Sequence, residues 1–106
     1  IIHCDEFQTE GTDKIAERIK KRVGDNPLYL SIDIDVLDPA FAPGTGTPEI
    51  AGMTTREMVN VLRGLSGLNL VSADVVEVSP AYDHAEVTSL AAATIVYELT
   101  NLFAKT

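Results

Sequence analysis

The order of strand-like and helix-like segments constrains the fold of this chain most strongly. Residues 28–34, "LYLSIDI", alternate between apolar and polar side chains, as in a strand with one buried face. Residues 68–78 are almost continuously apolar or small, which is typical of a strand covered on both faces. A helix-like segment follows each of them, so we expect a parallel sheet with right-handed crossovers. The predicted fold class is α/β, with three αβα layers.

The helix-like segments are residues 11–24, 54–65 and 83–103. Thr54 and Glu57 form a capping-box pattern at the start of the second, and Asp83 and Glu86 form a similar pair in the third. In the third helix the expected apolar stripe consists of Leu90, Ile95, Leu99 and Phe103. Residues 1–3 could be the end of a further strand, followed by a polar turn.

Three carboxylates follow the first strand-like segment, at Asp33, Asp35 and Asp38. Asp33 and Asp35 are two positions apart on an extended segment, so their side chains should point the same way. Two carboxylates at such a short distance cannot both stay ionised without a cation or strong donors beside them. A hard divalent ion would meet that need. The same residues could instead cap the neighbouring loop. Asp38, before Pro39, is interpreted as a residue that structures the loop.

The predicted site lies at the carboxyl edge of the sheet, where parallel sheets bind their ligands. Asp33, Asp35, the long loop of residues 38–53 and Glu77 all fall there. Asp74, inside the second strand, is interpreted as a structural hydrogen-bond acceptor, and His84 as a surface residue at a helix start.

Composition excludes several partners for the chain. It has 106 residues, which fits one domain, with 16 acidic against 8 basic residues and a formal net charge of −8. Nucleic acid and anionic membranes need a basic surface, so neither is expected. No apolar run approaches the ~18 residues of a membrane span. Cys4 is the only cysteine, which excludes an internal disulfide and a zinc-binding cysteine cluster.

Two other kinds of site also begin with Asp-x-Asp. An EF-hand loop needs an oxygen ligand at position 37 and glycine at position 38, where this chain has Leu37 and Asp38, so it is excluded. A phosphotransferase of the haloacid-dehalogenase type usually continues with Thr or Val where Leu37 stands. That alternative stays open.

The segment "SIDIDVLDPAFAPGTGTPEIAG" resembles the Ser-x-Asp-x-Asp-x-x-Asp-Pro signature of the ureohydrolases, the arginase and agmatinase family. The resemblance continues through "GLNLVSADVVEVSPAYDHAEVTSLAAATIVYEL", in which "EVSPAYDHAE" is more similar to agmatinases than to arginases. It implies that the chain forms part of the arginase/agmatinase fold.

The resemblance also implies a chemistry and a set of site residues. In the family, a hydroxide bridging two manganese ions attacks the guanidinium carbon of a small substrate, which releases urea and an amine. By position, Asp33 and Asp35 match metal ligands, Thr47 matches a substrate-contacting residue, and Glu77 matches the catalytic glutamate that pairs with the guanidinium group. The implied substrate is agmatine, which gives putrescine. The implied assembly is a homo-oligomer, a trimer or a hexamer.

Two family motifs are missing from these residues. Neither a Gly-Gly-Asp-His nor a His-x-Asp-Ala-His-x-Asp segment occurs, and His3, beside Cys4 and Asp5, matches neither. We therefore expect residues 1–106 to be the C-terminal portion of a single ureohydrolase catalytic domain. By itself this portion should be inactive and should bind manganese poorly. The alternative is a non-catalytic assembly module of the same family.

Overall fold

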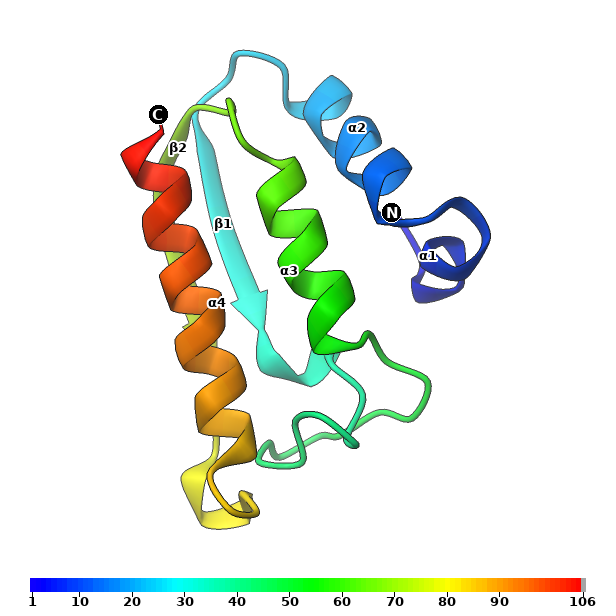
Figure 1. The fold of residues 1–106 in the computed structure, drawn as a ribbon, viewed down its shortest axis with the longest axis vertical. Helices are drawn as coiled ribbons and strands as arrows, with labels where there is room; N and C mark the ends of the chain where they lie inside the picture. The colour runs from blue at the N-terminus through cyan, green and yellow to red at the C-terminus, as the bar shows by residue number, and fades with distance from the viewer. Residues whose placement is uncertain (106) are drawn as a thin grey trace.

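The computed structural model describes residues 1–105 as an α/β unit, which confirms the predicted fold class (Figure 1). Its elements in chain order are α1 (Cys4–Glu10), α2 (Thr12–Val23), β1 (Leu28–Asp33), the 3₁₀ helix η1 (Ile34–Val36), α3 (Thr55–Gly64), β2 (Leu70–Val76), the 3₁₀ helix η2 (Pro80–Tyr82) and α4 (Val87–Ala104).

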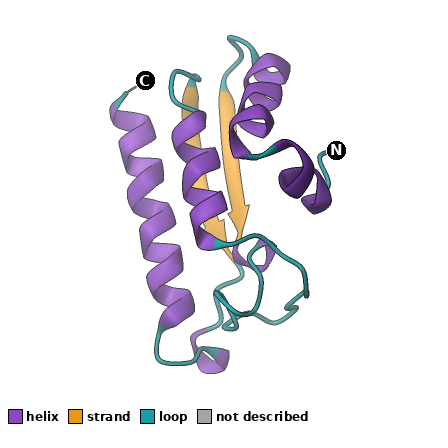
Figure 2. Cartoon of the chain, turned by 45° about the vertical axis from the view of Figure 1, so that its right-hand side comes forward, coloured by secondary structure: helices purple, strands orange, loops and turns teal. Residues whose placement is uncertain are grey.

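The sheet of the described chain consists of β1 and β2, which run parallel as predicted. Leu28 pairs with Leu70 at one end and Asp33 with Val76 at the other, with a register shift after Leu28. Helix α3 connects the two strands and α4 follows β2; both lie over one face of the sheet (Figures 1 and 2). The 38–53 loop and the turn before α4 therefore meet beyond the carboxyl ends of the strands.

The core lies between the sheet and helices α3 and α4. Its buried side chains include Ile32, Leu62, Leu70, Ile95 and Leu99. Helix α3 starts as predicted: Thr54 Oγ1 accepts from Glu57 N at 3.0 Å, and Glu57 Oε2 accepts from Thr54 N at 2.9 Å. This capping box satisfies backbone donors of the first turn and sets the helix start.

The other face of the sheet is bare within residues 1–105. Tyr29 on β1 is 57% exposed and Val71 on β2 is 56% exposed. The prediction that residues 68–78 are covered on both faces is therefore wrong for the described chain, because its helices pack on one face. The continuous apolar pattern shows only that this strand could be covered on both sides.

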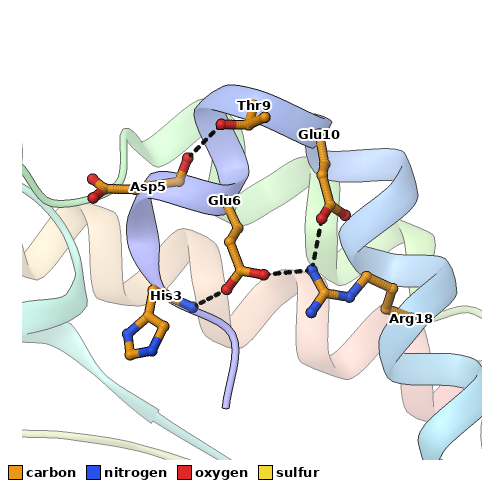
Figure 3. A network of polar contacts seen from close by, with 6 residues as sticks. All are labelled: His3, Asp5, Glu6, Thr9, Glu10 and Arg18. Carbon is orange, nitrogen blue, oxygen red and sulfur yellow. Dashed lines mark hydrogen bonds and ion pairs between the residues drawn. The ribbon is translucent and has the colours of Figure 1, made fainter.

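The N-terminus differs from the prediction of a strand end and a turn. Residues 1–3 are not in a strand, and Cys4–Glu10 form α1 instead. Arg18 of α2 donates to Glu6 at 2.8 Å and to Glu10 at 3.0 Å, while the other oxygen of Glu6 accepts from His3 N at 2.5 Å (Figure 3). The Arg18 contacts bridge two helices, so a local reading of the sequence could not detect them.

Helix α4 begins at Val87 rather than at residue 83. Ala85 and Glu86 have φ angles of 49° and 61°, so the chain turns there and cannot yet be helical. The predicted Asp83–Glu86 capping pair is therefore wrong. The predicted apolar stripe of this helix is also partly wrong. Ile95 and Leu99 are buried as predicted, but Leu90 is 64% exposed and Phe103 is 41% exposed. Leu102 is buried instead of Phe103.

By length and composition alone, α4 could cross a membrane, with a mean hydropathy of 1.3 over Val87–Ala104. The sequence prediction concerned an uninterrupted apolar run, and α4 contains none of that length, because polar residues such as Thr88, Ser89 and Glu98 interrupt it. Core helices of soluble proteins pass the same test. In the structure α4 packs against α3 and β2, and its buried Glu98 pairs with Arg63 of α3 at 2.7 Å.

Candidate active site

The acidic pair lies where β1 changes into η1. Asp33 is the last strand residue and Asp35 is in the 3₁₀ helix, so the expectation that both lie on one extended segment is wrong. The two residues nevertheless interact, since Asp35 N donates to Asp33 Oδ1 at 3.1 Å. Burial raises the pKa of Asp33, and the Asp35 carboxyl adds to this, while the Asp35 N–H opposes it. The ionised form of Asp33 is therefore disfavoured here, and a nearby cation would stabilise it.

Thr47 brings the long loop to this pair. Its hydroxyl donates to Asp35 Oδ2 at 2.9 Å. The contact spans twelve positions of the chain and orients the carboxylate from the loop side. A cavity of ≈ 430 Å³ lies beside the contact, lined by Cys4, Asp35, Val36, Thr47, Glu49, Ile50, Ala51 and Gly52.

Asp38 structures the 38–53 loop, as interpreted from the sequence. Its Oδ1 accepts from Ala40 N at 2.9 Å, and its Oδ2 accepts from Ala51 N at 3.1 Å and Gly52 N at 3.3 Å. Its own N–H donates to Met53 O at 2.8 Å. One carboxylate therefore joins both ends of the loop that carries Thr47.

Glu77 lies at the same sheet edge, one residue beyond β2. It follows Val76, the strand partner of Asp33, and neighbouring strands are ~4.8 Å apart. The Glu77 backbone has a φ of 68° and its side chain is exposed. A left-handed conformation of a residue other than glycine costs about 1–3 kcal/mol and is typical of functional sites. Ala51, Ala85 and Glu86 share a positive φ, so this conformation is consistent with a functional role for Glu77 but does not single it out.

The sequence analysis did not find the role of Asp83, which orders the turn before α4. Its carboxylate accepts from the N–H groups of His84, Thr88 and Ser89 at 2.9, 2.9 and 3.0 Å, and from Ser89 Oγ at 3.2 Å. Burial raises the pKa of Asp83, but the hydrogen bonds from Thr88, Ser89 and His84 outweigh it and hold the pKa well below its usual value. The available signal was an Asp close to a Thr-Ser pair at a helix start.

Two further interpretations can be compared with the structure. Asp74 accepts from Ser31 Oγ at 2.6 Å and from the Tyr29 hydroxyl, which confirms its structural role. His84 is exposed, as expected of a surface residue. Within residues 1–105, no group of three or more His, Cys, Asp or Glu side chains could hold a metal ion.

Comparison with known proteins identifies the family. The model of the arginase family matches residues 1–101, and the chain belongs to that family. It is 62% identical over its full length to putative agmatinase 1 of Schizosaccharomyces pombe, covering 27% of that protein. It is 54% identical to the agmatinase of Photorhabdus laumondii, over 93% of this chain and 32% of that protein. The resemblance read from the motifs is confirmed.

Solved structures agree with this assignment. A hypothetical agmatinase from Burkholderia thailandensis is 48% identical with a TM-score of 0.92, over 94% of this chain and 32% of that chain. The proclavaminate amidino hydrolase from Streptomyces clavuligerus is 47% identical with a TM-score of 0.96, over 98% of this chain and 35% of that chain. The expectation of part of the arginase/agmatinase fold is confirmed. The chain spans about a quarter to a third of the length of its curated relatives.

Proposed function

We propose that the complete protein containing this chain hydrolyses a linear guanidino compound to urea and an amine, with agmatine as substrate and putrescine as product. One arrangement carries the proposal: the Thr47 hydroxyl donates to the Asp35 carboxylate, the Asp35 backbone N–H donates to the Asp33 carboxylate, and Glu77 follows the strand partner of Asp33. The names of the agmatinase relatives support the choice of substrate.

Asp33 and Asp35 would hold the metal. Carboxylate oxygens are preferred ligands of hard divalent ions such as Mn²⁺, and a bound cation would stabilise the ionised form of Asp33, which burial and the Asp35 carboxyl disfavour. When bound, a manganese pair supplies a water acidic enough to act as the nucleophile at neutral pH. Thr47 would keep the Asp35 carboxylate oriented, because its hydroxyl already donates to Oδ2.

Glu77 would bind and orient the substrate. A carboxylate can accept two parallel hydrogen bonds from a planar guanidinium group, and this pairing fixes both the position and the plane of the group. Val76 places Glu77 beside the end of β1, so the guanidinium carbon would be presented to the edge that carries the acidic pair. The net charge of −8 favours a cationic substrate through electrostatic steering.

Residues 1–106 would be the C-terminal portion of a single catalytic domain, and would be inactive alone. Mn²⁺ takes about six oxygen or nitrogen ligands. Asp33 and Asp35 can fill only part of that shell, so the isolated chain should bind manganese weakly and release no urea. In the complete protein we expect a homo-oligomer, a trimer or a hexamer, as the family resemblance implies.

The test is urea release by the complete protein, with manganese added and then chelated. Agmatine, arginine and 4-guanidinobutyrate are compared. We expect manganese-dependent urea from agmatine, and a loss of about 10²-fold or more in kcat/KM for Glu77→Gln. Glu86→Gln is the matched control, because Glu86 is an exposed carboxylate whose side chain makes no capping hydrogen bond. Urea from another compound would change the substrate, and no urea would favour the non-catalytic alternative.

A further inference from the structure

We propose that Thr88 is a positioning residue, held by Asp83, that fixes Thr47 and Glu77 relative to each other. The inference rests on the proposed function, because Thr47 and Glu77 are the residues that it positions. Its basis is a buried contact between the 38–53 loop and the segment of residues 77–88.

Gly44 is the point where the two segments meet. Its N–H donates to Thr88 Oγ1 at 2.7 Å, and its carbonyl accepts from Ser79 N at 2.7 Å. Thr88 is fully buried, with 0% exposure. Both backbone groups of Gly44 are therefore used in binding the other segment, and the hydroxyl of Thr88 supplies one of the two bonds.

The contact leaves no room for a side chain on Gly44. A Cβ there would lie 2.9 Å from Asp83 Cβ and 2.9 Å from Thr88 Oγ1. Glycine is thus required by close approach. Two positions further on, a Cβ added to Gly46 would have no heavy atom within 4 Å. The loop is therefore tightly packed at Gly44 and open beside Thr47.

Asp83 holds Thr88 in place through the backbone. Its carboxylate accepts from Thr88 N and Ser89 N, across five and six positions, and so closes the turn that contains the left-handed Ala85 and Glu86. Because these hydrogen bonds stabilise the ionised carboxylate, the turn should be rigid at neutral pH. The first turn of α4 therefore carries Thr88 at a fixed place under the loop.

The contact is close in sequence to both site residues. Gly44 is three positions before Thr47, and Ser79 is two positions after Glu77. Thr47 orients a metal-binding carboxylate, and Glu77 would orient the guanidinium group. A misplacement of about 1 Å between such groups can lower a rate about 10²-fold. Loosening the contact should therefore reduce catalysis without removing a group that touches the substrate.

Amide hydrogen exchange on the complete protein tests the contact itself. We compare Thr88→Val, which has no hydroxyl, with Thr88→Ser, which keeps it. Thr45→Val is the matched control: Thr45 is also buried beside Gly44, but its hydroxyl has no partner within residues 1–105. We expect exchange at the Gly44 amide to become at least tenfold faster in Thr88→Val alone. Unchanged exchange in that variant would overturn the proposal.

Steady-state kinetics and metal content test the positioning role. Thr88→Val should lower kcat/KM for agmatine about 10–100-fold with unchanged manganese content, and Thr88→Ser should restore it to within about threefold. When Thr88→Val is combined with Thr47→Val, the further loss of kcat/KM caused by Thr88→Val should be smaller, since one of the positioned groups is already removed. Wild-type kinetics in Thr88→Val would contradict the proposal. If Thr88→Val does not fold, Asp83→Asn should show a smaller loss of kcat/KM and a smaller increase in exchange at the Gly44 amide.

These measurements separate the two proposals. If no guanidino compound yields urea, the proposed function fails, and the exchange rates still decide whether Thr88 holds the loop. If urea is released but the exchange and kinetics of Thr88→Val match the wild type, the positioning role fails alone.

Discussion

At the scale of single residues, the candidate site combines a carboxylate whose charge is disfavoured with a residue in an uncommon backbone conformation. Asp33 carries a raised pKa because of burial and the nearby Asp35 carboxyl, and Glu77 holds a left-handed backbone. Perturbed titratable groups and strained backbones both concentrate at functional sites. The two signals lie at the ends of adjacent strands: Asp33 is the last residue of β1, and Glu77 follows Val76, the last residue of β2.

Asp33→Asn should separate stability from metal binding. The raised pKa means that the folded state disfavours the Asp33 charge, and Asn keeps an oxygen that can accept from Asp35 N. We expect a Tm of the metal-free complete protein that is equal to or above wild type at pH 7, and manganese affinity that is at least tenfold lower. Calorimetry with and without manganese measures both. Asp25→Asn, at an exposed turn, is the control; a clear loss of metal-free Tm in Asp33→Asn would contradict this account.

Asp83 should make the protein sensitive to acid. Its folded pKa is lowered, so its contribution to stability is complete above the usual pKa of 3.8 and is lost as the pH falls further. Between pH 7 and pH 3, wild type should therefore lose more stability than Asp83→Asn, whose side chain does not titrate. Urea denaturation at several pH values gives the comparison. Parallel pH profiles for the two proteins would show that Asp83 makes no such contribution.

At the scale of elements, local signals predicted some boundaries and tertiary contacts decided the others. The Thr54–Glu57 capping box fixed the start of α3 as expected, because both partners lie within one turn. The start of α4 depends on hydrogen bonds to Asp83 across five and six positions, which no capping pattern describes. The strand-end aspartates were found through topology and family motif, but the bond between Gly44 and Thr88 joins residues 44 positions apart.

Gly64 should control the packing of α3 against α2. A Cβ at Gly64 would lie 2.6 Å from the Cβ of Ala16, which is 2% exposed. Alanine favours a helix over glycine by ~1 kcal/mol, but overpacking typically costs about 1–3 kcal/mol, so Gly64→Ala should destabilise the protein. Adding Ala16→Gly removes the clash and should recover much of the loss. Chemical denaturation of both variants tests this; equal stability of the single variant and wild type would contradict it.

At the scale of the whole molecule, the described chain presents two kinds of uncovered apolar surface. One face of the two-stranded sheet exposes Tyr29 and Val71, and the outer side of α4 exposes Leu90 and Tyr97, each of these two at 64%. Both strands are edge strands within residues 1–105, so unpaired backbone groups add to this surface. The net charge of −8 opposes contact between copies, and the balance between the two effects depends on salt.

The isolated 106-residue chain should therefore self-associate, and more strongly at high salt. The Debye length falls from about 30 Å at 0.01 M to about 8 Å at 0.15 M ionic strength, which screens repulsion and leaves the apolar attraction in place. Light scattering should show a mean mass that rises with concentration and salt. A Val71→Glu, Tyr97→Glu double variant should reduce association, because it puts charge on both surfaces and increases the net negative charge, whereas Lys21→Arg should leave it unchanged. A monomer at every concentration and salt would show that these surfaces do not drive association.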